Sequence, residues 1–482
     1  MRRKDIAIIV LAVGGIYGWL QFSHPGLQQD DYFHLRLTEM MRREGVLHEF
    51  PWMKHTIFSE RFVDKHFGFH VLLVPFTLAD DLKAGGKAAT VVMVLALGLA
   101  FYGFLARHGV RYALFWTFFF LFSSKVVMLR LLAVRPIAFS VLLYLLALHW
   151  MLRRRPFLLG AVALVFGWAY SAFPVLLGIV ILFTITDGLY HRTWDLKPVL
   201  AAIAGMGLSI VVNPYFPDNL RVMAVQYLSA SLVRSDPAMN LEWMPLSTWE
   251  FFSFSWPLWV VIGLVLFLVA SGRVRPRFET LCLFLLAAFF FITYSKVSRG
   301  IDQFYPFAVL FSAFAVSDAT LLAGAIGRTT KRLAAVLAMA AAVFVVILNV
   351  RDLKEGFREM DRIDNSGSAL WLKEHAAKGS EVFIANYAAF SQLFFYNREQ
   401  VYTLGLDPLF MKAKDERLYR LYNDALALRE DPYLVIHDVF GASYVHVEHI
   451  PRNRGLIQNF AGRRDRFELV FRDDFSDVYR VK

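Results

Sequence analysis

Long apolar runs alternate with short polar segments from the N-terminus to residue 351. A helix needs about 20 mostly apolar residues to cross a bilayer. A shorter run at 67–79 predicts an interfacial or re-entrant helix. The longer runs predict eleven membrane-spanning helices, at 5–22, 87–106, 112–129, 137–152, 157–172, 173–190, 198–213, 255–271, 278–295, 303–325 and 333–350.

The pattern changes after residue 351, where apolar and polar positions mix over short distances. These roughly 130 residues match the size of a small α/β domain. The predicted fold class is therefore an α-helical polytopic membrane protein, with a transmembrane domain at 1–351 and an extracytoplasmic α/β domain at 352–482. In the second domain we expect helices near 366–377 and 413–428, and strands at 381–387, 401–406, 432–439 and in a final pair at 467–482.

Composition excludes a single soluble domain and intrinsic disorder. Hydrophobic residues make up 57% of the 482 residues and charged residues 19%, against about 45–50% and about 25% in soluble domains. Cys282 is the only cysteine, which excludes an intrachain disulfide and a cysteine-based metal site.

Basic residues in alternate loops supply much of the net charge of +11. Cytoplasmic loops carry an excess of Lys and Arg, so we expect these loops on one side, together with the basic N-terminus. The chain is therefore predicted in the cytoplasmic (inner) membrane, with the N-terminus inside and the C-terminal domain outside. No nucleic-acid partner is expected. The loops hold Arg107 and Arg111, Arg153 to Arg155, Arg192 and Lys197, Arg273 to Arg277, and Arg328 to Arg332.

The first outer segment of this topology, 23–86, contains the stretch Asp30-Asp31-Tyr32-Phe33-His34-Leu35-Arg36. Carboxylates at the membrane surface cost free energy unless they are solvated, paired or metal-bound. One interpretation is a general base, or a metal ligand, of an interfacial active site. The other is a solvated N-cap for the helix that follows.

This stretch resembles the first-loop motif of class C glycosyltransferases, and most of all that of oligosaccharyltransferase catalytic subunits, roughly Asp-x-Tyr-Tyr-His-Leu-Arg. Asp30 takes the position of the family's catalytic aspartate, and Asp31 occupies the free position. His34 and Arg36 follow in register. The resemblance implies a polyprenyl-phosphate-linked sugar as donor, and an aspartate that acts at the outer membrane face.

A second stretch, Phe62 to Phe67, is similar to the Asp-x-His segment that ends the same loop in that family, and it contains Asp64 and His66. His66 and His70 are spaced i, i+4, so they share one helix face. Together with Asp64 they could form a metal site. The alternative is the polar face of an interfacial helix, with Asp64 and His66 shaping the active site.

The second outer segment, 123–136, departs from that family. Oligosaccharyltransferases carry an acidic pair here that helps to hold a divalent cation, whereas this segment has no acid and three cations, Lys125, Arg130 and Arg135. A metal site of the family type is therefore not supported, and any cofactor stays unknown. We expect the planar guanidinium groups of these arginines, in place of a divalent cation, to neutralise the donor phosphate. The alternative is snorkelling to anionic lipid headgroups.

Two later outer segments add candidates. Lys296 and Arg299 again place cations on the outer side, and the resemblance implies that they grip the donor phosphate. A surface ion pair between Arg299 and Asp302 is the alternative. In the long segment 214–254, Glu242 corresponds by position to a glutamate that a mobile loop contributes in oligosaccharyltransferases. Otherwise Glu242 is an ordinary interface residue.

These features together favour an inverting membrane glycosyltransferase that moves a sugar from a polyprenyl-phosphate donor to a glycan, lipid or protein acceptor. Asp30 and Asp31 are its catalytic candidates. The Trp-Trp-Asp-Tyr-Gly block with which oligosaccharyltransferases recognise peptides is missing, so asparagine-linked protein glycosylation is not supported. Two alternatives stay open. One is a transporter or lipid flippase, which usually carries ionisable residues near the bilayer midplane. The other is a non-catalytic scaffold of the same fold.

Overall fold

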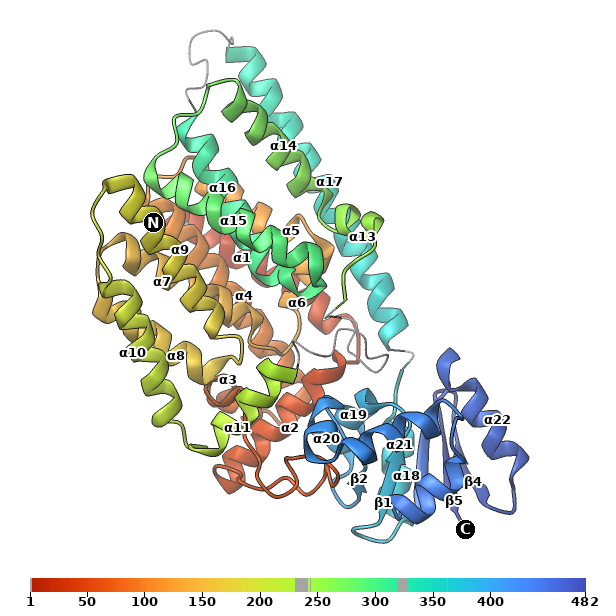
Figure 1. Ribbon diagram of the computed structural model, residues 1–482. Helices are drawn as coiled ribbons and strands as arrows, with labels where there is room; N and C mark the ends of the chain where they lie inside the picture. Colours follow the sequence, from red (N-terminus) through yellow and green to blue (C-terminus); the bar gives the residue numbers. More distant parts are fainter. Residues whose placement is uncertain (1, 230–241, 243, 320–327, 362) are drawn as a thin grey trace.

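A computed structural model describes residues 2–229, 242, 244–319, 328–361 and 363–482. Helices account for 69% of the chain, and most of them form a bundle. A C-terminal α/β unit projects from one end of this bundle (Figure 1). The predicted class, a mostly helical protein with a small C-terminal α/β part, is confirmed to that extent.

The bundle helices coincide, wholly or in part, with the apolar runs of the sequence. Within the described residues, four of them are long and apolar enough to cross a membrane, namely α1, α4, α9 and α15, and a bent pair adds a fifth if it is one span. The predicted count of eleven spans is therefore not confirmed. The bundle consists of α1 (Arg3–Phe22), α4 (Leu82–Arg107), α5 (Ala113–Phe122), α6 (Lys125–Leu131), α7 (Ile137–Leu152), α8 (Pro156–Ala169), α9 (Pro174–His191), α10 (Lys197–Val211), α14 (Trp256–Ala270), α15 (Phe278–Lys296), α16 (Ile301–Asp318) and α17 (Arg328–Met360).

The apolar run at 112–129 is not one straight helix. It is bent by 83° between α5 and α6. Ser124 begins α6, because its hydroxyl accepts a hydrogen bond from the Val127 N–H at 3.4 Å and so caps a new helix start. The bend turns α6, and the basic segment that follows it, away from the axis of α5.

Shorter elements connect the bundle helices. The run at 67–79 forms α3 and the adjoining 3₁₀ helix η1, which together are too short to span, as predicted. Gln28 and Asp31 form a capping box at the start of α2, and Gly45, with a φ of 86°, ends this helix. These elements are α2 (Gln29–Glu44), α3 (Phe67–Leu73), η1 (Val74–Leu78), α11 (Asp218–Ala224), the π-helical η2 (Val225–Ser229), α13 (Thr248–Ser253) and η4 (Ser298–Gly300).

Basic loops gather at the end of the bundle where α1 begins. Tyr102, near the end of α4, donates a hydrogen bond to Asp5 of α1. The Arg111 N–H donates to Ser317 of α16 at 2.9 Å, and Arg277 is paired with the adjacent Asp318 at 2.6 Å. The loops after α4 and before α15 therefore lie on the N-terminal side of the bundle.

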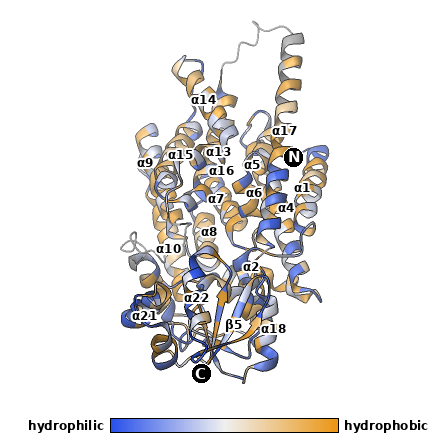
Figure 2. Cartoon of the chain, turned by 90° about the vertical axis from the view of Figure 1, so that its right-hand side faces the viewer, coloured by the Kyte–Doolittle hydropathy of each residue, from blue (hydrophilic) through white to orange (hydrophobic). Residues whose placement is uncertain are grey.

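The opposite end of α1 meets the end of α17. The Gly26 N–H donates a hydrogen bond to Asp361 at 3.2 Å, and the His24 ring stacks on Phe357 with centroids 4.1 Å apart. The C-terminal unit is attached at this end. Figure 2 shows hydrophobic positions along the bundle helices and a larger share of hydrophilic positions in the C-terminal unit.

The C-terminal unit is built on a five-stranded mixed sheet of order β2-β1-β3-β5-β4. Strand β1 pairs in parallel with β2 and β3, and β5 pairs antiparallel with β3 and β4. Its elements are α18 (Ser366–His375), β1 (Glu381–Ile384), η5 (Tyr387–Ala389), α19 (Phe390–Tyr396), β2 (Val401–Tyr402), α20 (Leu409–Lys414), α21 (Glu416–Leu426), η6 (Leu434–Val439), β3 (Tyr444–Glu448), η7 (Pro451–Asn453), α22 (Arg454–Gly462), β4 (Phe467–Arg472) and β5 (Ser476–Val481).

One strand prediction in this unit is wrong. The residues at 432–439 are helical and include the π-helical η6 (Leu434–Val439), and the strand beside β1 is Tyr444–Glu448. A short apolar run does not distinguish a strand from a helical turn by its pattern. Asp431 accepts a hydrogen bond from the Tyr433 N–H at 2.9 Å, which favours a helical start.

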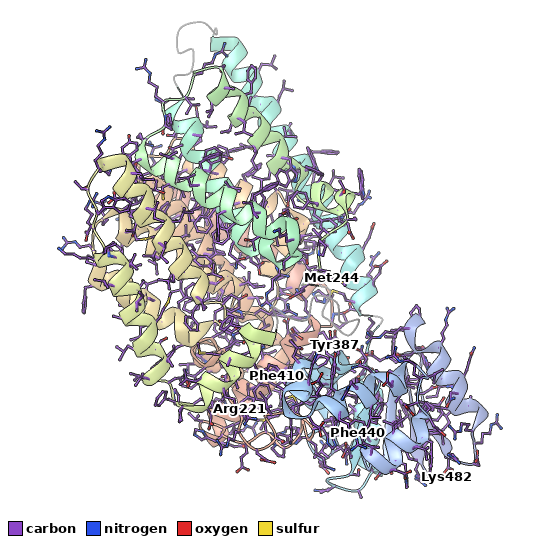
Figure 3. The ribbon with its side chains drawn as sticks, in the orientation of Figure 1. Arg221, Met244, Tyr387, Phe410, Phe440 and Lys482 are labelled. Atoms are coloured by element: carbon purple, nitrogen blue, oxygen red, sulfur yellow. The ribbon has the colours of Figure 1, made fainter. Side chains whose placement is uncertain are left out.

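The first outer loop and the C-terminal unit share one hydrophobic core. Phe50 of the loop packs against Phe390 and Phe394 of α19. The loop also pairs with the edge strand β2, because the Tyr402 N–H donates to the Trp52 carbonyl at 2.9 Å. Figure 3 shows Tyr387 and Phe410 of the C-terminal unit at this junction. The loop thus covers an exposed sheet edge and holds the C-terminal unit against the bundle.

Candidate functional site

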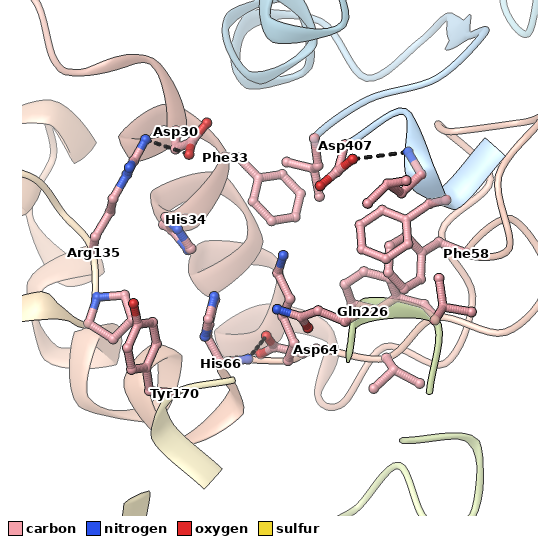
Figure 4. Close-up of a pocket in the computed structure, with 18 of the residues that line it drawn as sticks. Asp30, Phe33, His34, Phe58, Asp64, His66, Arg135, Tyr170, Gln226 and Asp407 are labelled. Carbon is pink, nitrogen blue, oxygen red and sulfur yellow. Dashed lines mark hydrogen bonds and ion pairs between the residues drawn. The ribbon is translucent and has the colours of Figure 1, made fainter. Parts of the chain in front are cut away.

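A cavity of about 130 Å³ lies where the first outer loop, the bundle and the C-terminal unit meet (Figure 4). One buried water needs only about 10–15 Å³ by this measure, so the cavity accepts a much larger group. Its lining includes Asp30, Phe33 and His34 of α2, residues 63–66 and His70 around α3, residues 135–137, Tyr170, Gln226, Glu242, Arg299, and residues 406–410 of the C-terminal unit.

Asp30 lies in the first turn of α2, and its side chain is 41% exposed. Its Oδ2 accepts a hydrogen bond from Arg135 Nη2 at 2.6 Å. Within the described residues no hydrogen bond reaches its Oδ1. His34 follows one turn later on the same helix face. Asp30 therefore presents one carboxylate oxygen to the cavity while Arg135 holds the other.

Asp31, the second acidic candidate, has a different environment. It is almost completely buried and does not line the cavity. Its Oδ1 accepts a hydrogen bond from the Val134 N–H at 2.9 Å, and its Oδ2 accepts one from the Gln28 N–H at 3.2 Å. Burial raises the pKa of Asp31 to about 8, against the opposing effects of Arg135 and the Val134 N–H. These contacts make Asp31 a link between α2 and the segment after α6.

Replacing Asp31 with Ala is expected to lower the free energy of unfolding by about 1–3 kcal/mol, because the buried Val134 N–H loses its acceptor. Thermal unfolding in detergent at pH 5 measures the loss, with Asp80→Ala, an exposed acid of the same loop, as the control. Equal stability of Asp31→Ala and wild type would contradict this structural role.

The stability contributed by Asp31 is also expected to depend on pH. Its pKa is about 8 in the folded protein and 3.8 when unperturbed, so the folded state binds more protons between these values. Stability from this group is therefore present at low pH and decreases as the pH rises from about 4 to 8. The difference in unfolding temperature between wild type and Asp31→Ala should shrink over that range. A difference that grows with pH would exclude this assignment.

Glu242 connects the arginines of the site. Its Oε1 accepts hydrogen bonds from Arg135 Nη1 at 2.8 Å and Arg130 Nη1 at 3.1 Å, and its Oε2 lies 3.7 Å from Arg299 Nη1. Burial alone would raise the pKa of Glu242, but Arg135, Arg299 and Arg130 lower it to about 2. Glu242, which was predicted from its position in the long outer segment, thus lines the cavity. Its ionised carboxylate contacts three guanidinium groups.

Three other predicted residues do not line the cavity. Arg130 forms a bidentate ion pair with Asp302, including an Nη2–Oδ2 contact of 2.7 Å. It contacts Glu242, which itself lines the cavity. Lys296 is exposed at the end of α15. Arg36 donates to the Phe395 carbonyl of α19 at 2.9 Å, so it fixes the C-terminal unit to α2. The predicted cations Arg135 and Arg299 do line the cavity, and Lys65 lines it together with them.

Lys65 was not singled out from the sequence. Within the described residues its ammonium group has no hydrogen bond, and it lies 5.4 Å from the centre of the Phe410 ring. Burial lowers the pKa of Lys65, and the charge of Asp407 opposes this shift. In the sequence, Lys65 lies between Asp64 and His66, in a polar stretch that is typical of a solvated helix start. Only the tertiary structure places Lys65 at the cavity.

The histidines around α3 form a hydrogen-bonded chain. Asp64 Oδ2 lies 2.6 Å from His70 Nδ1, and His70 Nε2 lies 2.7 Å from His34 Nδ1. Asp64 Oδ1 also accepts a hydrogen bond from the His66 N–H at 2.9 Å, and the His66 ring stacks on Tyr170. The predicted residues His34, Asp64 and His66 are thus brought together, and His70 joins them in the middle of the chain.

Asp407 enters the cavity from the C-terminal unit, on the side opposite Asp30 and His34 (Figure 4). Leu406 before it has a φ of 63°, a left-handed conformation that is costly for a residue with a side chain. Asp407 Oδ1 accepts a hydrogen bond from the Leu409 N–H at 3.0 Å, and burial raises the pKa of this carboxyl. The sequence offered no signal for it beyond an acid before a proline, which is typical of a turn.

Metal binding was left open by the sequence. Within the part of the chain that the structure describes, no three His, Cys, Asp or Glu side chains are arranged to hold a metal ion. In the chain from Asp64 to His34, four of the nitrogen and oxygen atoms that could bind a metal are already engaged with one another.

The sequence matches no protein-family model and no curated protein. Several solved structures are similar in fold. The oligosaccharyltransferase of Archaeoglobus fulgidus, tethered to an acceptor peptide, has a TM-score of 0.65 at 11% identity, over 93% of this chain and 69% of that one. ArnT from Cupriavidus metallidurans, bound to undecaprenyl phosphate, has a TM-score of 0.58 at 14% identity, over 99% and 98%.

The arabinofuranosyltransferase AftD from Mycobacteria has a TM-score of 0.53 at 12% identity, and the match spans 100% of this chain but 40% of that one. All three have the class C glycosyltransferase fold, and this chain has it as well. The predicted resemblance to class C glycosyltransferases is thereby confirmed for the fold. At such low identity the likeness concerns the fold. This fold and the long apolar helices characterise an integral membrane protein.

Proposed function

We propose that this protein is an inverting membrane glycosyltransferase, which moves a sugar from a polyprenyl-phosphate-linked donor to an acceptor hydroxyl. One observation carries the proposal: Asp30 shares a single cavity with the cations Lys65, Arg135 and Arg299. The reaction needs a carboxylate that binds the attacking hydroxyl, together with positive charge for the departing phosphate.

In this reaction the acceptor oxygen forms a bond to the anomeric carbon of the donor sugar. The bond between that carbon and the phosphate oxygen breaks, and its electron pair leaves with the polyprenyl phosphate. The acceptor proton passes to a base on the protein. Asp30 Oδ1 binds or deprotonates the hydroxyl, while Arg135 keeps the carboxylate oriented through Oδ2. Asp31 takes no part in this step, because it is buried and bonded to backbone N–H groups.

The cavity cations would hold the donor phosphate. Lys65 presents its ammonium group without a hydrogen-bonding partner among the described residues. Arg299 donates to the Tyr170 hydroxyl at 3.0 Å, which fixes the direction of its guanidinium group. A planar guanidinium binds phosphate through two hydrogen bonds. The undecaprenyl phosphate bound by ArnT, a protein of the same fold, supports a lipid phosphate as the ligand.

The C-terminal unit would contribute to the acceptor side. It brings Asp407 into the cavity opposite Asp30, at the cost of the left-handed conformation of Leu406. A carboxyl group at this place can hydrogen-bond the hydroxyls of a sugar acceptor. The topology that fits this arrangement has the cavity and the C-terminal unit at the outer face of the cytoplasmic membrane, because the basic loops lie at the opposite end of the bundle.

Purified protein in nanodiscs tests the activity directly. It would be incubated with radiolabelled undecaprenyl-phosphate sugars and with an extract of envelope glycans, lipids and proteins as the acceptor source. We expect label in a product that partitions into water or into a new lipid, together with free undecaprenyl phosphate. A donor that stays intact with every sugar tried would contradict the proposal. Label that crosses proteoliposome membranes with its phosphate bond intact would indicate a flippase.

A binding measurement tests the phosphate site without knowledge of the sugar. Undecaprenyl phosphate should raise the unfolding temperature in detergent, and undecaprenol, which has the same tail without the phosphate, should have a much smaller effect. The reason is that three cations line the cavity. Equal stabilisation by both lipids would show that the tail alone is recognised, and it would argue against these cations as a phosphate site.

A further inference from the structure

The buried chain Asp64–His70–His34 ends at the cavity. All three side chains are at least nine-tenths buried, and their two contacts, 2.6 Å and 2.7 Å, are in the range of strong hydrogen bonds. His34 lines the cavity one helical turn from Asp30. Because His34 Nδ1 is engaged by His70, the ring nitrogen left for a ligand in the cavity is Nε2.

The hydrogen-bond partners determine where the ring protons lie. A carboxylate only accepts hydrogen bonds, so a neutral His70 facing Asp64 Oδ2 carries its proton on Nδ1. Its Nε2 is then an acceptor, and His34 must donate to it from Nδ1. This leaves the Nε2 lone pair of His34 directed to the cavity. The single charge on Asp64 thus selects the tautomer of both histidines, and it selects the form that can accept a proton from a ligand.

The surroundings of His34 favour its neutral form. Burial lowers the pKa of His34 well below its usual range, and His70, Arg135 and Lys65 act in the same direction. Among the described residues, the other charged or titratable groups around the chain include Asp30 on the same helix, His66 beside the ring and Tyr215 near Asp64. At neutral pH His34 therefore has an unprotonated nitrogen available.

We propose that His34 is the general base of the transfer reaction, and that His70 and Asp64 are positioning residues that orient it and stabilise its charged form. This inference rests on the proposed function, and it assigns the proton that the reaction releases. The acceptor hydroxyl is held by Asp30, its oxygen attacks the sugar, and its proton goes to His34 Nε2. The imidazolium ion that results is stabilised by Asp64 through His70.

The tautomer is measurable without any substrate. Nitrogen-15 NMR of histidine-labelled protein in nanodiscs separates protonated from bare ring nitrogens, and His34→Gln identifies the His34 signals among the 13 histidines. We expect wild-type His34 to carry its proton on Nδ1, although free histidine prefers Nε2. A neutral His34 protonated on Nε2, or an imidazolium form at pH 7, would overturn the proposal.

An isosteric substitution sharpens this test. In Asp64→Asn the amide oxygen can still accept the His66 N–H, while the amide NH₂ must face His70 Nδ1. Both histidines then have to exchange tautomers, so that His34 Nε2 becomes protonated and loses its basicity. We expect the NMR signals of His34 to report this exchange in the folded variant. Unchanged signals would show that Asp64 does not control the chain.

Activity provides the second readout. His34→Gln and Asp64→Asn should reduce transfer by about 10²–10³-fold, as expected for loss of a general base, without weakening the binding of undecaprenyl phosphate. The acidic limb of the wild-type pH profile should lie below pH 6.5 and should vanish in His34→Gln. His437→Gln, an exposed histidine of the C-terminal unit, is the matched control. Full activity of His34→Gln with the same acidic limb would refute the relay.

The two proposals fail in different ways. If no lipid-linked sugar is transferred by wild-type protein, the proposed function fails, while the NMR measurement still decides the tautomer. If Asp30→Asn abolishes transfer and His34→Gln does not, the transferase stands and Asp30 itself is the base. If both substitutions abolish transfer and the tautomer exchange occurs, the carboxylate orients the hydroxyl and the histidine takes its proton.

Discussion

Asp30→Asn is expected to reduce sugar transfer by about 10³-fold and to leave the fold intact. An amide keeps the size of the side chain, but it loses the negative charge that pairs with Arg135 and that, in the proposed mechanism, binds the attacking hydroxyl. Asp30 is 41% exposed, so its replacement costs little stability. The measurement is the initial rate with a radiolabelled undecaprenyl-phosphate sugar, alongside the unfolding temperature of the same preparation.

The control for this variant is Asp80→Asn, an exposed acid of the same outer loop. It should retain wild-type activity. Binding of undecaprenyl phosphate should be retained or strengthened in Asp30→Asn, because the substitution removes a negative charge near the phosphate site and releases Arg135 from its ion pair. An active Asp30→Asn variant would remove the basis of the proposed function. Loss of activity together with loss of phosphate binding would instead assign Asp30 to donor binding.

Arg299→Gln is expected to cause the second large loss, about 10²–10³-fold in transfer. Arg299 reaches the cavity from η4, lies 3.7 Å from Glu242 and donates to the Tyr170 hydroxyl at 3.0 Å. In the proposed mechanism, these contacts orient a charge that stabilises the phosphate as it leaves. The rate measures the loss, and the stabilisation by undecaprenyl phosphate should fall while that by undecaprenol stays the same.

Lys378→Gln is the matched control for Arg299, because it removes a positive charge that is 82% exposed on the C-terminal unit. It should leave both measurements unchanged. If Lys378→Gln and Arg299→Gln weakened phosphate binding equally, the effect would come from net charge and not from the site. An Arg299→Gln variant with normal binding but slow transfer would place Arg299 at the transition state alone.

The helices of the bundle can be predicted closely from the sequence. The directions in which successive helices run cannot. Apolar runs predict helices because their burial is favourable in any arrangement, whereas the 83° bend between α5 and α6 depends on local capping and packing. This bend brings the segment with Arg135 next to α2. In the C-terminal unit the run at 432–439 was predicted as a strand and is the helical η6, because local capping decides between the two.

The candidate site was also only partly predictable. The motif around Asp30 carries a recognisable pattern, and the predicted outer placement of Arg135 and Arg299 distinguishes them from the basic loops. The adjacent acids Asp30 and Asp31 could not be separated, because neighbouring positions on a helix point about 100° apart and either one can face a cavity. The structure directs Asp30 to the cavity and Asp31 to the Val134 N–H.

The sequence by itself determined the class of protein, its apolar helices, the C-terminal α/β part and the first-loop motif, because hydrophobic periodicity and local motifs are properties of consecutive residues. Only the tertiary structure decided that Asp407, Lys65 and His70 belong to the same site as Asp30. These residues come from segments up to several hundred positions apart. Their contacts result from the shared core of the first outer loop and the C-terminal unit, and no local pattern encodes such a long-range packing.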